Sequence, residues 1–172
     1  ILTISRVVKC LSNNICGLKY LTNYSNTLSL LMFIMFLCDK KHECIFSAIS
    51  NISFAMCSAF WFVYIMFGEK ALYGKYDPLL YEVYIDHLLI PVASMTIAIL
   101  NNCYNNSKEN IKCTLMLGLF WVCLTLHAGP AYPFLRDSKG NMNILKLTGM
   151  VTVFGAVSYG FDYICCKKKD EK

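Results

Sequence analysis

The sequence predicts an all-α protein, a polytopic bundle of membrane-spanning helices. Hydrophobic residues make up 56% of the 172-residue chain and its mean hydropathy is +0.47. Soluble domains contain only about 45–50% apolar residues. The apolar residues are also gathered into runs long enough to cross a hydrocarbon core of ~30 Å as helices. The five runs are residues 20–38, 45–67, 79–100, 111–128 and 144–166.

The segments between the runs are short and polar, which predicts a single domain in which sequential helices are antiparallel neighbours. Residues 1–19 form an N-terminal arm whose apolar stretches are too interrupted by charge to span a membrane. Residues 167–172 form a basic tail. The Lys and Arg residues balance between the two sides, so only the tail favours a cytosolic C-terminus. The endoplasmic reticulum and the plasma membrane are not distinguished.

Charge and cysteine usage exclude several classes of function. The net charge of +5 lies mostly at segment ends and in the tail, and no basic cluster is interleaved with stacking aromatics, so we expect no nucleic-acid partner. The ten cysteines are scattered, and neither CxxC nor HExxH occurs. The sequence therefore predicts no structural metal and no cofactor, and the lipid bilayer is the expected environment.

The third run, residues 79–100, carries Glu82, Asp86 and His87 in otherwise apolar sequence. An ionisable group inside a bilayer costs roughly 2.5–3.5 kcal/mol, so such groups usually face a protein interior or a wet cavity. Pro91 has no N–H for the carbonyl of His87, which predicts a kink there and an acceptor that protein or water must satisfy. The alternative is that His87 is an interfacial histidine in a packed bundle.

Alternation of the spans places the start of the first run, the start of the third and the end of the fourth at one face of the membrane. Thr22, His87 and His127 meet there. A threonine hydroxyl becomes a nucleophile when a base accepts its proton, and a neutral imidazole does so near pH 7. The first N–H groups of a helix can donate to an oxyanion. The pattern predicts Thr22 as the nucleophile and His87 as the base.

Three further residues are candidates to support the base. Tyr84 and His127 are better placed than Asp86 to orient His87, because adjacent helical residues point about 100° apart. Other interpretations stay open, since Thr22 is also a residue typical of a helix cap. His127 is equally consistent with a polar residue at the membrane interface.

Three short blocks, in this order and spacing, carry a family resemblance. They are Lys19-Tyr20-Leu21-Thr22 at the start of the first run; Leu72-Tyr73, followed fourteen residues later by His87; and Trp121-Val122-Cys123, followed by His127 and Tyr132-Pro133-Phe134-Leu135. From about residue 19 to residue 166, the chain resembles the family of androgen-induced gene proteins and androgen-dependent TFPI-regulating proteins.

The resemblance implies an intramembrane threonine hydrolase that cleaves fatty acid esters of hydroxy fatty acids, so a long-chain fatty acyl ester is the expected substrate. It places the nucleophile at Thr22 and the essential histidine at His87. The family has six spans with both termini cytosolic, which implies that the first span is missing here. The chain also departs from the pattern. Ile90 stands where a second histidine is found, and the acidic residue of the last span, Asp162, is offset by about one position.

Two other classes of function compete with the esterase. A non-catalytic lipid-binding or regulatory membrane scaffold would use the same residues for structure alone. A small-solute transporter using the acids of the third run lacks support, because the runs show no evident inverted repeat.

Overall fold

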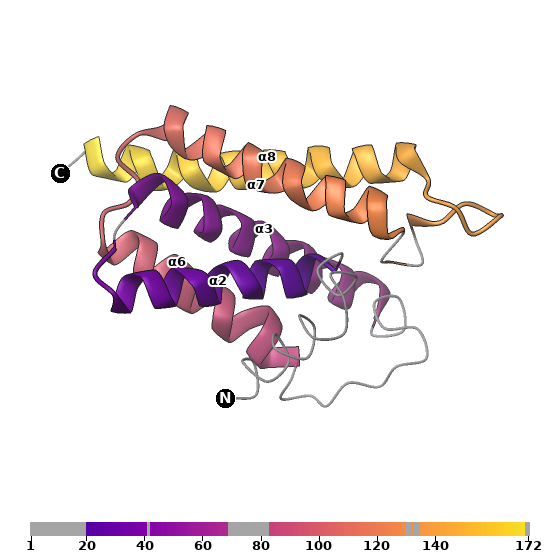
Figure 1. The fold of residues 1–172 in the computed structure, drawn as a ribbon, viewed down its shortest axis with the longest axis horizontal. Helices are drawn as coiled ribbons and strands as arrows, with labels where there is room; N and C mark the ends of the chain where they lie inside the picture. Colours follow the sequence, from indigo (N-terminus) through magenta and orange to yellow (C-terminus); the bar gives the residue numbers. More distant parts are fainter. Residues whose placement is uncertain (1–19, 41, 69–82, 130–131, 133–134, 171–172) are drawn as a thin grey trace.

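The computed structural model describes residues 20–40, 42–68, 83–129, 132 and 135–170, and these form an all-α bundle (Figure 1). The predicted fold class is therefore confirmed. The predicted N-terminal arm, Leu72-Tyr73 and the first residues of the third run, 79–82, lie outside the described residues. In chain order the elements are α2 (Leu21–Leu37), α3 (Glu43–Phe67), the π turn η2 (Ile85–Leu89) continued by α6 (Ile90–Leu100), α7 (Ser107–Ala128) and α8 (Ile144–Asp170).

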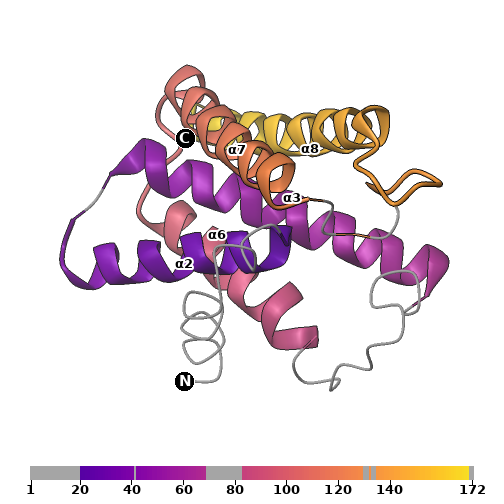
Figure 2. The same cartoon turned by 45° about the vertical axis from the view of Figure 1, so that its right-hand side comes forward.

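Helix α3 lies at the centre of the bundle. The pair α2 and η2–α6 covers one side of it, and the pair α7 and α8 covers the other (Figures 1 and 2). Of the most apolar window of α3, 44% is buried, whereas only 11% of the corresponding windows of α7 and α8 is buried. The two outer helices therefore present most of their apolar surface to the surroundings.

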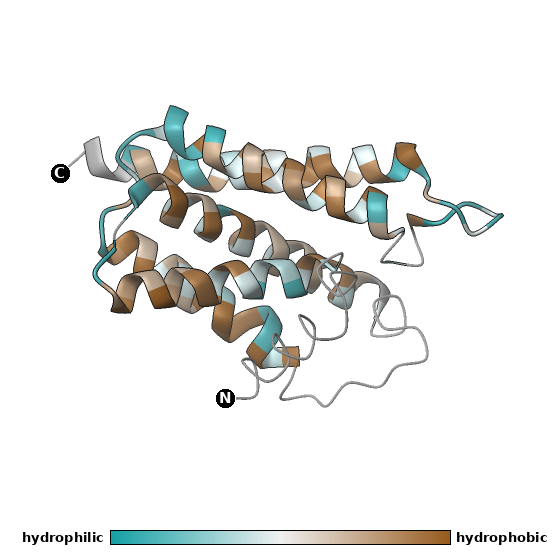
Figure 3. Ribbon diagram, viewed as in Figure 1, coloured by the Kyte–Doolittle hydropathy of each residue, from teal (hydrophilic) through white to brown (hydrophobic). Residues whose placement is uncertain are grey.

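Three helices are long and apolar enough to cross a membrane, which supports a membrane protein. They are Glu43–Met66, Ser107–Ala128 and Ile144–Lys167. Apolar residues run along the helices, and hydrophilic residues gather in the connecting loops and at helix ends (Figure 3). The two remaining apolar helices, Leu21–Leu37 and Ile85–Leu100, are shorter. The count of five spans therefore stays a prediction.

Asparagine caps explain where the last two helices begin. Helix α7 begins four residues before the predicted run, because the side-chain oxygen of Asn106 accepts a hydrogen bond from the backbone N–H of Glu109 at 3.4 Å. At α8, the side-chain oxygen of Asn143 accepts from the N–H of Lys146 at 3.0 Å. Polar caps thus set where these two helices begin, which hydropathy alone does not predict.

Small polar residues let α2 and α3 approach each other. The hydroxyl of Ser53 on α3 lies 3.2 Å from that of Ser25 and 3.3 Å from that of Ser29, both on α2. All three side chains are buried. Small residues of this kind are favoured where helices pack inside a bilayer, because they allow close approach and pair their own polar groups.

A buried carboxylate ties together α3, α7 and α8 at one end of the bundle. Asp162 on α8 is fully buried. One of its oxygens accepts from the side-chain amides of Asn51 at 3.2 Å and Asn110 at 3.1 Å, and the other accepts from the hydroxyl of Ser107 at 2.7 Å. A buried charge persists only when such donors replace water. Asp162 is thus hydrogen-bonded to residues of two other helices.

Tyr104, in the loop between α6 and α7, joins the same group. Its hydroxyl contacts the Ser50 hydroxyl at 2.8 Å and the Asn51 side-chain oxygen at 3.2 Å. Burial raises the pKa of Tyr104, while its hydrogen bond to Ser50 lowers it, and the net shift is upward. The phenol therefore keeps its proton as a donor. We call Asn51, Tyr104, Ser107, Asn110 and Asp162 the polar network.

We expect the change Asp162→Ala to lower the free energy of unfolding by at least about 2 kcal/mol, because it removes the acceptor shared by Ser107 and the buried side-chain amides of Asn51 and Asn110. Thermal unfolding in detergent micelles measures the effect. Glu109→Ala is the matched control, because it removes an exposed acid near the same end of the bundle. Equal unfolding midpoints for the two variants would contradict a stabilising role for the polar network.

Candidate functional site

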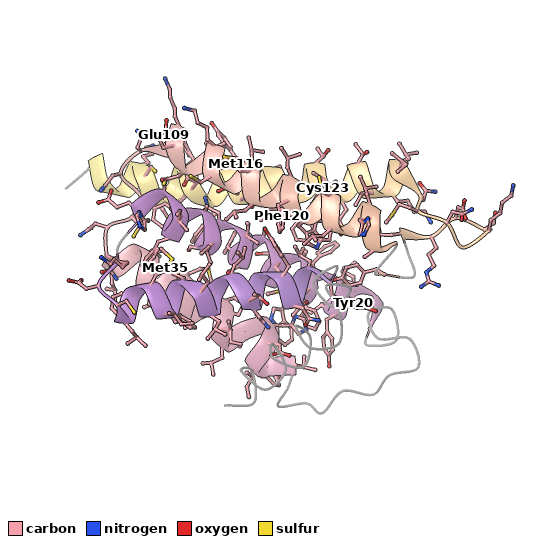
Figure 4. The ribbon with its side chains drawn as sticks, viewed as in Figure 1. Tyr20, Met35, Glu109, Met116, Phe120 and Cys123 are labelled. Atoms are coloured by element: carbon pink, nitrogen blue, oxygen red, sulfur yellow. The ribbon has the colours of Figure 1, made fainter. Side chains whose placement is uncertain are left out.

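The end of the bundle opposite the polar network contains the starts of α2, η2 and α8 and the ends of α3 and α7 (Figure 1). Tyr20 marks this end of α2 in Figure 4, whereas Met35 and Glu109 mark the other end of the bundle. The helix starts and ends that the sequence predicts to share one membrane face therefore lie together. Within this end, η2 packs on α2, α3 and α6.

His87 is held by two neighbouring aromatic residues of α3. The residue is the third of η2 and only 6% of it is exposed. Its imidazole lies face to face with the ring of Phe60, with centroids 3.4 Å apart and planes 5° apart. Its backbone carbonyl accepts a hydrogen bond from the indole N–H of Trp61 at 3.1 Å. Helix α3 thus fixes both the ring and the backbone of the predicted base.

The π turn shows what happens to the carbonyl that Pro91 leaves without an intrahelical donor. Residues 85–89 form one wider turn, in which the N–H of Ile90 donates to the carbonyl of Ile85, and Pro91 follows in the first turn of α6. Such turns occur frequently at functional sites. The carbonyl of His87 is satisfied by Trp61, so protein rather than water supplies the missing donor.

The predicted base is part of an aromatic cluster. The cluster consists of Phe60, Trp61, Tyr64, Tyr84 and His87. The rings of Phe60 and Trp61 meet edge to face at 5.4 Å, and the exposed Tyr84 ring lies 5.6 Å from that of Trp61. The position of Tyr84 is therefore defined by its neighbour on α3. Its predicted role in orienting the imidazole stays a prediction.

Thr22 is the second residue of α2 and is half-buried. The residue at the N-cap position is Tyr20, which makes no side-chain cap, so Thr22 does not occupy the capping position. Instead, the hydroxyl of Tyr132 accepts a hydrogen bond from the N–H of Leu21 at 3.0 Å. The first N–H of the helix, expected to be open to an oxyanion, is thus occupied by a phenol.

Tyr132 also contacts Thr22 directly, because the hydroxyl and the backbone N–H of Thr22 hydrogen-bond to the same phenol oxygen. Burial raises the pKa of Tyr132, while these hydrogen bonds and the one from Leu21 lower it. The net shift is upward. Tyr132 lies in the link between α7 and α8 and brings a protonated phenol beside the predicted nucleophile.

A third polar residue lies one turn further along α2, on the face that carries Thr22. Asn26 is only 4% exposed, and its side-chain oxygen accepts no hydrogen bond from the described residues. A buried acceptor of this kind costs about 1–3 kcal/mol when it stays unsatisfied. Asn26 therefore offers a hydrogen-bond acceptor inside the bundle on the Thr22 side of α2.

The other predicted supporting residues are placed differently. His127 is exposed in the last turn of α7, and α7 packs on α3 and α8 rather than on η2. His127 thus lies at the predicted end of the bundle, but on the other side of α3 from η2. Asp86 is half-buried beside His87 on the π turn. Within the described part of the chain, no group of three or more His, Cys, Asp or Glu side chains is placed to hold a metal ion.

The sequence assigns no role at the site to Phe60, Trp61 or Tyr132, although Tyr132 belongs to one of the blocks that carry the family resemblance. In a run as apolar as residues 45–67, a Phe-Trp pair is indistinguishable from lipid-facing surface. Tyr132 falls in a polar link between helices, and the periodicity of the sequence does not describe the path of such a link. A proline four residues after His87 was the only signal for Trp61, because it predicts a carbonyl in need of a donor.

We expect Trp61→Phe to destabilise the protein by about 1–3 kcal/mol, because it leaves the carbonyl of His87 buried without a donor. Pro91→Ala should by itself change stability little, since that carbonyl is already satisfied. In the double variant, the restored N–H of residue 91 can replace the indole donor. The loss of stability in the double variant should therefore be smaller than the sum of the losses in the two single variants. Thermal unfolding of all four proteins measures this coupling, with the exposed Phe62→Leu as a control for losing an aromatic ring.

Comparisons with protein-family models, with curated proteins and with solved structures give no match to this chain. The function must therefore be argued from the residues and their geometry.

Proposed function

We propose that the chain is an intramembrane lipid esterase, a multi-pass membrane protein that crosses the bilayer five times, with Thr22 as nucleophile and His87 as base. One observation carries the proposal. Helices α2 and η2 pack against each other at one end of the bundle, and they carry Thr22 and His87 in their first turns. Phe60 stacks on the imidazole of His87, and Trp61 donates a hydrogen bond to its backbone carbonyl.

The reaction follows the chemistry of a hydroxyl nucleophile. The oxygen of Thr22 attacks the ester carbonyl carbon while His87 accepts the hydroxyl proton. His87 then gives this proton to the departing alkoxide, which leaves as an alcohol, and the acyl group stays on Thr22. A water molecule, deprotonated by His87, attacks the acyl-enzyme and releases the fatty acid. The cycle needs no metal or cofactor.

Exposed apolar residues beside His87 favour a long-chain acyl substrate. Leu88, Leu89 and Val92 follow it on η2 and α6 and are 39%, 62% and 43% exposed. In a bilayer this surface faces lipid, so an acyl chain dissolved in the leaflet can approach laterally. Its ester would stop at the first turns of the helices, near headgroup depth, where water arrives from the loops. Fatty acid esters of hydroxy fatty acids meet this description.

A non-catalytic lipid-binding or regulatory scaffold is the alternative. Two contacts favour it, because Tyr132 occupies the first N–H of α2 and Phe60 covers one face of the imidazole. Both contacts also serve packing. The two proposals differ in one chemical respect, which is whether Thr22 forms a covalent bond to an acyl group or to a reactive probe.

We expect purified protein to hydrolyse a long-chain ester and to be labelled by a fluorophosphonate probe. Thr22→Ala and His87→Ala should abolish both, while Thr22→Ser should retain part of the activity because it keeps the hydroxyl. His127→Ala is the matched control, an exposed histidine at the same end of the bundle, and should behave like wild type. Equal hydrolysis by wild type and Thr22→Ala would reject the nucleophile, and a folded wild-type protein that is neither active nor labelled would favour the scaffold.

Acyl chain length should act mainly through KM. Each buried methylene contributes about 0.8 kcal/mol, which corresponds to about fourfold in affinity, so KM should fall with each added methylene until the site is filled. Part of this gain is available to any ester dissolved in lipid, so the trend should be clearest at low detergent concentration. A series of p-nitrophenyl esters measures it. If a short, hydrophilic ester is hydrolysed as efficiently as a long one, and still depends on Thr22, lateral access is refuted while the catalytic pair stands.

A further inference from the structure

The phenol hydroxyl of Tyr132 lies against the first turn of α2. The N–H of Leu21 donates to it at 3.0 Å, and both the N–H and the hydroxyl of Thr22 hydrogen-bond to it. The ring is fixed by Tyr20, which meets it edge to face with centroids 5.8 Å apart, and by the apolar cluster around Leu21 and Leu135. The hydroxyl is thus held beside the oxygen that the proposed function makes the nucleophile.

A phenol in this position has one proton to donate. Because burial raises the pKa of Tyr132 in spite of its hydrogen bonds with Leu21 and Thr22, the hydroxyl stays protonated at neutral pH and above. A hydroxyl that accepts a hydrogen bond becomes a better donor, since hydrogen bonds in a chain polarise one another. The N–H of Leu21 therefore strengthens the O–H of Tyr132 as a donor.

We propose that Tyr132 is a catalytic residue that donates its hydrogen bond to the oxyanion formed on Thr22. This inference rests on the proposed function. When the Thr22 oxygen bonds to the ester carbon, its proton moves to His87 and the carbonyl electron pair moves onto the carbonyl oxygen. That oxygen accepts from the O–H of Tyr132, which keeps its proton throughout. When the tetrahedral intermediate collapses, the carbonyl re-forms, the bond to the alcohol breaks, and His87 protonates the leaving alkoxide.

A purely structural role makes a different demand on the same atom. As a cap for α2, Tyr132 acts only as an acceptor for the N–H of Leu21, and a phenolate would perform that role better than a phenol. As an oxyanion donor it needs its proton, so ionisation must end its contribution. The dependence of kcat on pH therefore separates the two roles.

Tyr132→Phe tests the donor. We expect kcat for a long-chain ester to fall by about 10²–10³-fold with little change in KM, because the lost hydrogen bond forms only in the transition state. Tyr24→Phe is the matched control. It removes a hydroxyl from the same apolar cluster, but that hydroxyl donates to the carbonyl of Leu117 on α7, away from Thr22. Its kcat should stay near that of wild type.

Fluorotyrosine at position 132 provides a second test that keeps the ring, the hydroxyl and the fold. Fluorination lowers the pKa of the phenol, so the loss of kcat at alkaline pH should move to lower pH by as much as the free phenol's pKa falls. An alkaline limb that does not move, or a Tyr132→Phe variant with the kcat of wild type, overturns the inference while leaving the esterase intact. Absence of Thr22-dependent hydrolysis in the wild type removes the proposed function itself, and the oxyanion role with it.

Discussion

The buried carboxylate of Asp162 is the interaction on which the arrangement of the outer helices depends. Without water, its two oxygens need several donors, and these come from Asn51 on α3 and from Ser107 and Asn110 on α7. The observed register of α7 and α8 against α3 is the one that brings these donors to the two oxygens. In a bundle whose outer helices are only slightly buried, apolar burial cannot fix that register alone, because lipid tails are as apolar as the helices themselves. A polar network in which the buried groups are hydrogen-bonded can fix that register.

The two ends of the bundle are therefore held together by different interactions. The end with Asp162 is held by hydrogen bonds among buried side chains. The opposite end is held by aromatic stacking and by individual hydrogen bonds to backbone groups, such as the one that Trp61 donates to the carbonyl of His87. Stacking fixes the position of a ring without occupying all its polar atoms. The proton exchange that we propose for His87 would need this kind of support. The division is consistent with a chain that places stability at one end and chemistry at the other.

The sequence predicts the helices well, because runs of apolar residues at membrane length have few alternative structures. It also predicts which helix ends share a face, since short links make neighbours antiparallel. It cannot predict on which side of α3 each helix lies. The sequence groups His127 with His87, whereas in the structure α7 packs on α3 and α8, and η2 packs on α2, α3 and α6. Nor does the sequence predict the contact of Tyr132 with α2. Tyr132 comes from a link, and its bond to the first N–H of α2 depends on the path of that link rather than on any period in the sequence.

The difference in helix length sets the depth of the candidate site. Helix α3 has 25 residues and α2 has 17, so α3 is longer by about 12 Å at 1.5 Å per residue. The end of α2 and the start of α3 lie at the same end of the bundle, so the difference in length falls at the end that carries Thr22 (Figures 1 and 2). Figures 1 and 2 both show α3 extending past the start of α2. Thr22 is thus recessed from the tip of α3. In the proposed esterase, the ester group would meet Thr22 there while its acyl chain stays in the leaflet and water enters over the recessed end.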